Sequence, residues 1–245
     1  MREDSIGNRM KENYESRYRI KLTRRMPVII RLDGKAFHTL TKKCEKPFDT
    51  NFSETMKLTG LMLMSEIQGA KCAYIQSDEI SFLITDFDRL TTEGWFDYNL
   101  QKIVSVSAGI ASAYFTKNWE PLGDGHGMIA VFDSRAFNIP KEEVCNYFIW
   151  RQQDWVRNSI QMLAQSHYSH KELYGRNQPA MHEMLHEKGI NWANLEDRWK
   201  NGIYLDSTES EIESIDAPIF TKDRECIEKH LKPTEEQSIK SSESL

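Results

Sequence analysis

The chain has 245 residues, of which 39% are hydrophobic and 28% charged, a composition typical of a globular protein with a sizeable core. No apolar run approaches the roughly 20 residues of a membrane span, and the polar N-terminus does not have the apolar region of a signal peptide. The net charge of -5 does not exclude an RNA partner, because 206–245 hold 11 acids and 5 bases, whereas 1–205 hold 26 acids and 27 bases. Four widely spaced cysteines form no C-x-x-C pair, so we expect a cytoplasmic protein with reduced thiols and no membrane partner.

The first part of the chain predicts a β-α-β-β order of elements. Residues 4–25 have the charge pattern of a helix, and 28–32 form a β-branched strand that breaks at a glycine. A helix rich in Met and Leu is expected over 50–68. The segment 73–84 then predicts two strands joined by a tight acidic turn.

The second part of the chain predicts more helix than strand. We expect a helix over 100–115, a strand over 128–132, a long aromatic-rich helix over 141–165, a loop over 166–180, a helix over 181–188 and a last strand over 202–205. This order favours the α+β class, with a palm-type, ferredoxin-like antiparallel sheet that has helices on one face. We expect a palm-like catalytic region at 1–140, a helical RNA-binding and oligomerisation region of the same domain at 141–205, and an acidic C-terminal appendage at 206–245.

Two acid-bearing segments are the strongest functional signal in the sequence. Asp33 follows the first strand, and Asp78 and Glu79 lie in the turn of the hairpin. Either segment alone is also an ordinary polar turn. If the two segments pair side by side, however, their carboxylates reach the same cations, as a two-magnesium phosphoryl-transfer site requires.

Several ordered segments resemble the tRNA(His) guanylyltransferase family. The matching stretches are Arg31-Leu32-Asp33-Gly34-Lys35-Ala36-Phe37-His38, Lys46-Pro47, Gln76-Ser77-Asp78-Glu79-Ile80-Ser81-Phe82, Phe132-Asp133-Ser134-Arg135-Ala136-Phe137 and Tyr147-Phe148-Ile149-Trp150-Arg151-Gln152. Members of this family have a polymerase-like palm but add nucleotides to the 5′ end of RNA, in the 3′-to-5′ direction. The resemblance implies that the partners are tRNA and nucleoside triphosphates and that the chain forms a homotetramer. The RNA 5′ end would be activated by ATP, by GTP or by a triphosphate that it already carries.

The resemblance also implies roles for individual residues. Asp33, Asp78 and the Gly34 carbonyl would bind two Mg²⁺ ions. Glu79 beside them would be a third catalytic residue that either shapes the site or binds metal. Residues that match the family's nucleotide-binding positions are Gly34, Lys35, Ala36, Phe37, His38, Lys46, Ser77 and Lys102. The family's arginine three residues before that last lysine is Asn99 here.

One departure from the family pattern bears on the substrate. Members dedicated to tRNA(His) carry a His-Ile-Asn-Asn motif, where this chain has Val156-Arg157-Asn158-Ser159. This makes the chain resemble the Thg1-like-protein branch, whose members act as template-dependent repair polymerases of the tRNA 5′ end. The alternative is a tRNA(His)-specific enzyme that adds a single G with other recognition residues. Candidate RNA contacts are Arg17, Arg19, Arg24, Arg25, Arg157 and Asn158.

Other interpretations are weaker. His182-Glu183-Met184-Leu185-His186 matches the zinc motif H-E-x-x-H, but the extended pattern needs a third histidine where Trp192 stands. A non-catalytic RNA-binding protein would not need the acidic residues to be intact. A palm-type nucleotide cyclase would have no use for the long helical segment after Pro140.

Overall fold

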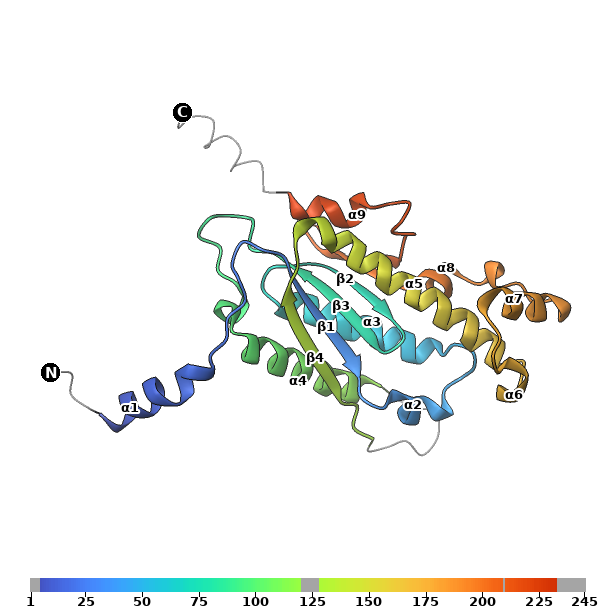
Figure 1. Ribbon diagram of the computed structural model, residues 1–245, viewed down its shortest axis with the longest axis horizontal. Helices are drawn as coiled ribbons and strands as arrows, with labels where there is room; N and C mark the ends of the chain where they lie inside the picture. The colour runs from blue at the N-terminus through green and yellow to red at the C-terminus, as the bar shows by residue number, and fades with distance from the viewer. Residues whose placement is uncertain (1–4, 120–127, 209, 233–245) are drawn as a thin grey trace, which may run out of the picture.

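The computed structural model describes residues 5–119, 128–208 and 210–232. Within them, six strands form one antiparallel sheet in the order β4-β1-β3-β2-β5-β6. Figure 1 shows the first four of these side by side. The strands are β1 (Val28–Gly34), β2 (Ala70–Gln76), β3 (Glu79–Ile84), β4 (Phe132–Asn138), β5 (Ile203–Ser207) and β6 (Ile212–Asp216). The antiparallel sheet with packed helices confirms the α+β class.

Helices α3 (Thr50–Glu66), α4 (Leu100–Asn118), α5 (Lys141–Gln165) and α7 (Gln178–Glu187) lie close to where the sequence predicts them. The other described helices are α1 (Ile6–Asn13), α2 (Phe37–Leu40), α6 (His170–Leu173), α8 (Asp197–Asn201) and α9 (Glu225–Glu228). The start of α3 is fixed by Asp49, whose carboxylate accepts the Phe52 amide at 2.8 Å. None of the described helices is both long and apolar enough to cross a membrane.

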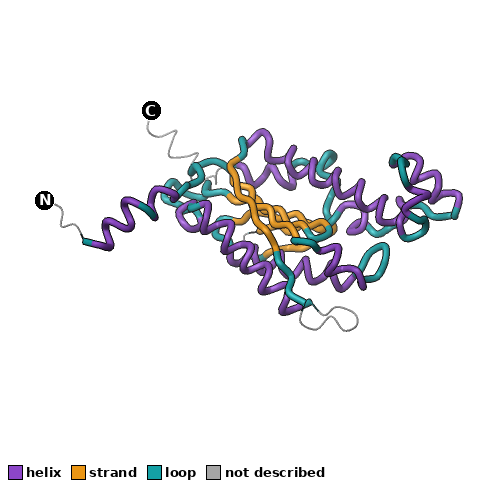
Figure 2. Tube along the Cα trace, turned by 60° about the horizontal axis from the view of Figure 1, so that its bottom comes forward, coloured by secondary structure: helices purple, strands orange, loops and turns teal. Residues whose placement is uncertain are grey.

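Helices cover both faces of the sheet, not one as the sequence predicts (Figure 2). Alternate residues of β1 point to opposite sides: Ile30 packs in the core under α3 and α4, and Ile29 packs in a second core under α5. The reason is visible in β3, where every residue is buried, so both of its faces need a cover. The β4 edge of the sheet is less well covered than β3, because the side chains of Asp133 and Arg135 on β4 are about half exposed.

Two predicted elements near the N-terminus and before β4 are wrong in their bounds. The helix expected over 4–25 ends at Asn13, because the following chain pairs with the start of α4: Leu22 donates to the Tyr98 carbonyl at 2.9 Å. The strand expected over 128–132 instead begins at Phe132, where pairing with Gly34 of β1 starts. Tertiary pairing sets both boundaries.

The described part of the acidic C-terminal segment packs into the fold and is not a peripheral appendage. Strand β6 adds to the edge of the sheet, and Phe220 and Ile227 are fully buried in the core under α5. The Phe220 amide also donates to the Gln152 side chain on α5 at 2.9 Å. The acidic residues between these apolar positions are exposed. Because they dominate the composition of the segment, the composition alone does not reveal that its apolar residues pack in the core. The remainder of the predicted appendage, 233–245, lies outside the described residues.

Candidate active site

The structure brings Asp33 and Asp78 together. Strand β1 pairs with β3 so that Asp33 lies opposite Glu79, and the Gly34 amide donates to the Asp78 carbonyl at 3.1 Å. Asp78 is the second residue of the two-residue turn between β2 and β3, and Ser77 before it takes a positive φ of 47°. The end of one central strand and the tip of the neighbouring hairpin therefore carry the two carboxylates.

Burial and neighbouring carboxylates disfavour the ionised form of both aspartates. Burial raises the pKa of Asp78 to about 6, and the Asp33 carboxylate adds to this rise. Burial also raises the pKa of Asp33, with further contributions from Glu79 and Asp133. A divalent cation would relieve this repulsion, and Mg²⁺ binds sites that offer one or two carboxylates and leave positions for water and phosphate. The donor set of the two aspartates fits that ion.

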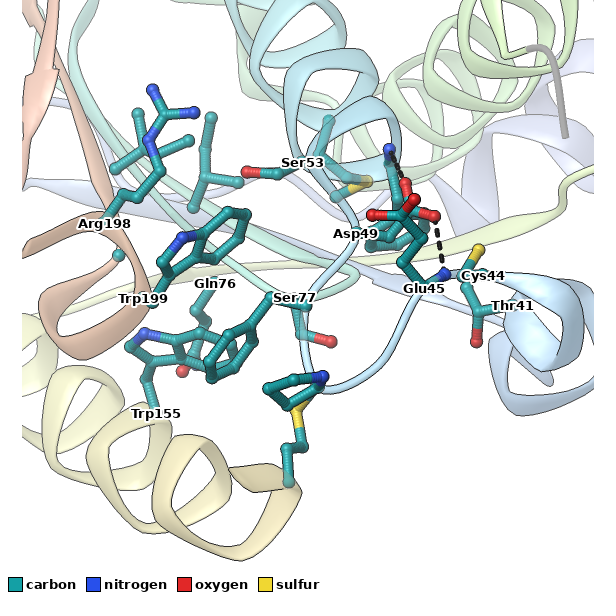
Figure 3. Close-up of a pocket in the computed structure, with 18 of the residues that line it drawn as sticks. Thr41, Cys44, Glu45, Asp49, Ser53, Gln76, Ser77, Trp155, Arg198 and Trp199 are labelled. Atoms are coloured by element: carbon teal, nitrogen blue, oxygen red, sulfur yellow. Dashed lines mark hydrogen bonds between the residues drawn. The ribbon is translucent and has the colours of Figure 1, made fainter. Parts of the chain in front are cut away.

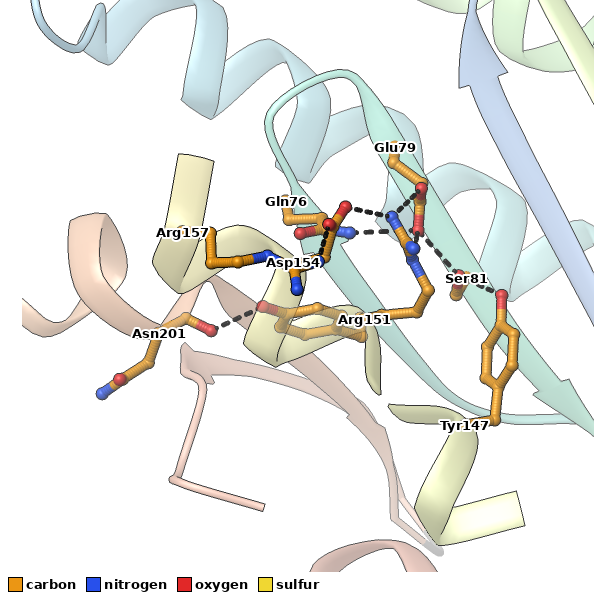
Figure 4. A network of polar contacts seen from close by, with 9 residues as sticks. Gln76, Glu79, Ser81, Tyr147, Arg151, Asp154, Arg157 and Asn201 are labelled. Carbon is orange, nitrogen blue, oxygen red and sulfur yellow. Dashed lines mark hydrogen bonds and ion pairs between the residues drawn. The ribbon is translucent and has the colours of Figure 1, made fainter. Parts of the chain in front are cut away.

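Of the two roles expected for Glu79, its contacts favour shaping the site over binding metal. It is buried, and both of its oxygens accept hydrogen bonds from Arg151 of α5, each at 2.7 Å (Figure 4). A carboxylate held in a two-bond pair with a guanidinium is neutralised. Glu79 is thus a partner of Arg151 and not a free cation ligand.

The turn after Asp33 presents three of the eight predicted nucleotide-binding residues to solvent. Lys35, Ala36 and His38 are exposed there. Phe37 is an exception, because its ring is buried against Phe115 and Phe132 in the core. Its packing explains the glycine: a Cβ on Gly34 would lie 2.3 Å from the Phe37 ring. Phe37 therefore shapes the turn and cannot offer its side chain to a ligand.

A cavity lies beside the hairpin tip, and Lys46 and Ser77 line it (Figure 3). Its wall includes the Phe48 and Trp199 rings, stacked with centroids 5.0 Å apart. Two buried polar atoms in this wall, the indole Nε1 of Trp155 and the amide oxygen of Gln76, have no hydrogen-bond partner among the described residues. An aromatic wall with one spare donor and one spare acceptor suits a planar, hydrogen-bonding ligand.

Lys102 does not join this site within the chain. Phe115, thirteen residues further along α4, contacts Phe132, which pairs with Gly34 beside the aspartates. A helix rises about 1.5 Å per residue, so Lys102 lies roughly 20 Å away along α4. Its ammonium group instead lies 5.8 Å from the Phe96 ring.

The predicted RNA contacts fall into two separate groups. Arg17 and Arg19 are exposed in the segment that follows α1, which projects from the body of the molecule (Figures 1 and 2). Arg24 donates to the Thr92 carbonyl at 2.7 Å, and the Arg25 amide donates to Asp86, so both bind within the chain near the start of β1. The second group, Arg157 and Asn158, is exposed on α5, where Arg157 donates to Asp154 at 2.5 Å.

Two arginines that the sequence analysis did not select lie next to the aspartates. Arg31 and Arg135 are directly opposite each other on β1 and β4, and the buried Nε of Arg31 has no partner among the described residues. Like charges directly opposite each other are destabilising, and here Asp133, 3.4 Å from Arg135, and Asp33 supply nearby negative charge. The sequence could have indicated a role for Arg31, because it stands two residues before Asp33 and side chains two residues apart lie on the same face of a strand.

The H-E-x-x-H motif lies on α7, with one of its histidines packed against an aromatic ring. His182 packs edge-on against Trp192, with ring centroids 5.9 Å apart. Across the described parts of the chain, no three His, Cys, Asp or Glu groups are placed to hold one metal ion. The magnesium site discussed above differs in kind, since it has two carboxylates and relies on phosphate and water for other ligands.

Comparison with known proteins identifies the family of this chain. The family model for tRNAHis guanylyltransferase matches residues 7–140, which is more than half of the chain. A bacterial tRNA(His) guanylyltransferase (Thg1)-like protein solved in complex with ATP is 50% identical, with a TM-score of 0.88 over 93% of this chain and 99% of that one. A complex of such a protein with GTP is 44% identical, with a TM-score of 0.79 over the same shares.

A curated relative gives the same family by sequence alone. The tRNA(His) guanylyltransferase of Schizosaccharomyces pombe is 33% identical over 147 residues, which are 57% of this chain and 54% of the yeast enzyme. This chain thus spans about half the length of that relative. The chain belongs to the tRNA(His) guanylyltransferase family of nucleotidyltransferases that act on tRNA.

Proposed function

We propose that this protein adds nucleotides to the 5′ end of truncated tRNA in the 3′-to-5′ direction, as the opposing template base directs, and releases pyrophosphate. The observation that carries this proposal is the meeting of Asp33 and Asp78 at the end of β1 and the hairpin tip. Further support comes from the bacterial Thg1-like protein that was solved with ATP, at 50% identity. That likeness covers nearly the full length of both chains.

The residues around the two aspartates divide the work of phosphoryl transfer. Asp33 and Asp78 would hold two Mg²⁺ ions, which when bound lower the pKa of an attacking hydroxyl and neutralise pyrophosphate. That hydroxyl is the 3′-OH of the incoming nucleotide, and it attacks the activated 5′ phosphate of the RNA. Arg31 and Arg135 would hold triphosphate oxygens, and the cavity beside Ser77 would hold a base.

The substrate preference rests on the segment that departs from the tRNA(His)-dedicated motif. Val156 stands where those enzymes carry histidine, and Ser159 is buried. The Ser159 hydroxyl donates to the Trp199 carbonyl at 2.5 Å and accepts from the Trp192 indole at 3.0 Å. A position used for packing in this way is not free to select a tRNA, which favours repair directed by the template.

The test compares two transcripts that carry a 5′-triphosphate: a tRNA without its first nucleotide, and a full-length tRNA(His). We expect the wild type, with Mg²⁺, to extend the truncated tRNA and to stop at full length. Asp33→Asn should lose this activity at least 100-fold. G addition to full-length tRNA(His), with no extension of truncated tRNA, would favour the tRNA(His)-specific alternative. No addition to either, with tRNA still bound, would leave a non-catalytic RNA-binding protein.

We propose further that the protein is a cytoplasmic homotetramer. Four free cysteines support a reducing compartment. Exposed apolar residues on α1, Ile6 and Met10, support an oligomeric contact. Helix α5, which the sequence suggested for an interface, uses most of its apolar residues inside the chain. Sedimentation velocity at several concentrations tests the oligomeric state.

A further inference from the structure

Arg151 of α5 binds Glu79, one of the two residues that close the turn carrying Asp78, and Glu79 in turn binds the other, Gln76. Gln76 and Glu79 are paired across the hairpin on either side of that turn. Arg151 binds Glu79 with Nε and Nη2, and Gln76 donates to the same Glu79 oxygen at 3.1 Å. Figure 4 shows the three side chains converging between the hairpin and α5.

This contact is built into the interior. Arg151 and Glu79 are each only 7% exposed. The guanidinium is fixed from its other side by Asp154, which accepts from Nη2 at 2.9 Å, and by the Trp150 ring, 4.5 Å from Cζ. A lysine could not reproduce this arrangement, because it has no planar fork of donors.

The hairpin tip needs such an anchor. Asp33 and Asp78 repel each other, and Glu79 lies directly opposite Asp33 on the adjacent strand. Without a cationic partner for Glu79, the repulsion would push the tip away from the end of β1. The ion pair opposes this movement by tying the tip to a helix of 25 residues.

We propose that Arg151 is a positioning residue, which holds the turn so that the Asp78 carboxylate stays within reach of the same cations as Asp33. The inference rests on the proposed function, because it assumes that the two aspartates bind divalent cations. Arg151 itself touches neither the cation nor the nucleotide. Its effect is on metal affinity and on the mobility of the turn.

The test uses the full-length protein without nucleotide or RNA. Mn²⁺ binding is followed by electron paramagnetic resonance, and hydrogen exchange is measured on peptides that cover 70–84. The variants are Arg151→Met, Arg151→Lys and, as a control, Arg224→Met, which removes an ion pair to Glu228 far from the turn. We expect Arg151→Met to weaken Mn²⁺ binding at least tenfold and to speed exchange at the turn. Arg151→Lys should lie between Arg151→Met and the wild type, and Arg224→Met should equal the wild type.

Two results would overturn the proposal in different ways. If wild type binds Mn²⁺ and Arg151→Met binds it equally or more tightly with unchanged exchange, Arg151 has no positioning role and the proposed function stands. If the wild type binds no Mn²⁺, the cation site itself fails, and the inference fails with it. Should Arg151→Met not fold, Arg151→Lys decides, because it keeps the charge and loses the second hydrogen bond.

Discussion

At the scale of single residues, the ionised carboxylates of the candidate site lower the free energy of unfolding when no cation is bound. The pKa of Asp78 rises from 3.8 to about 6 in the fold. The folded protein therefore binds a proton at this carboxyl more tightly than the unfolded chain does. It follows that stability falls as the pH rises from about 4 through about 6, and the cost is fully present above that range.

Asp78→Asn should consequently stabilise the protein at pH 7.5 while it abolishes nucleotide addition. A shift from 3.8 to about 6 corresponds to about 3 kcal/mol in the free energy of unfolding when no divalent cation is present. The gain should shrink to about 0.5 kcal/mol near pH 4, where the carboxyl is protonated in the folded protein and partly protonated in the unfolded chain. Urea unfolding at both pH values measures it, and an unchanged or lower stability at pH 7.5 would contradict this account.

The arginine pair makes a second prediction at the same scale. Arg31→Gln and Arg135→Gln should each raise the KM for the nucleoside triphosphate by about 10- to 150-fold, since a charge-assisted hydrogen bond contributes about 1.5–3 kcal/mol. Arg176→Gln, in the exposed chain between α6 and α7, is the matched control and should leave KM unchanged. Steady-state kinetics with varied triphosphate distinguishes these variants. Unchanged KM values in both arginine variants would remove the pair from the site.

At the scale of elements, periodic and well-bounded segments were predictable and tertiary packing was not. Helix α5 occupies 141–165 as expected, because Pro140 starts it and its apolar spacing is regular. The N-terminal helix was predicted too long, because none of the α1 residues is buried and pairing with the start of α4 takes over the following chain. The C-terminal strand was missed, because β6 is a mostly exposed edge strand with few apolar residues.

The packing of the C-terminal segment can be tested directly. Phe220→Ala should cost about 3–5 kcal/mol of unfolding free energy, since the ring contacts Tyr74, Tyr204 and Phe148 in the core. Ile219→Ala is a neighbouring control that should cost less than about 1 kcal/mol, because Ile219 is 40% exposed. Denaturant unfolding compares them. A cost below about 1 kcal/mol for Phe220→Ala would support the appendage that the sequence suggested.

In the candidate site, too, local strand pairing was predictable from the sequence and long-range contacts were not. Asp33 and Asp78 were predictable because strand pairing alone brings them together. The roles of Glu79 and Phe37 were not, because each depends on a partner distant in sequence: Arg151 for the carboxylate and Phe115 for the ring. A motif fixes which residues are near the reaction but not which of them face inward.

At the scale of the whole molecule, the site lies where the fold leaves the sheet open. Helix α5 covers one side of the hairpin, and the side chains of Asp133 and Arg135 on β4 remain about half exposed. An RNA end and a nucleotide can therefore approach the aspartates along β1 and β4. Recognition of duplex RNA by shape and backbone leaves the choice of nucleotide to base pairing.

Nucleotide choice is the most direct test of this account. Truncated, 5′-triphosphorylated tRNA transcripts with each of the four bases opposite the missing nucleotide would be incubated with Mg²⁺ and each of the four nucleoside triphosphates, and addition rates would be measured in single turnover. The account predicts that the fastest addition in each series is that of the complementary nucleotide, and that Asp78→Asn removes all addition. Addition of G at the same rate opposite every base would contradict it.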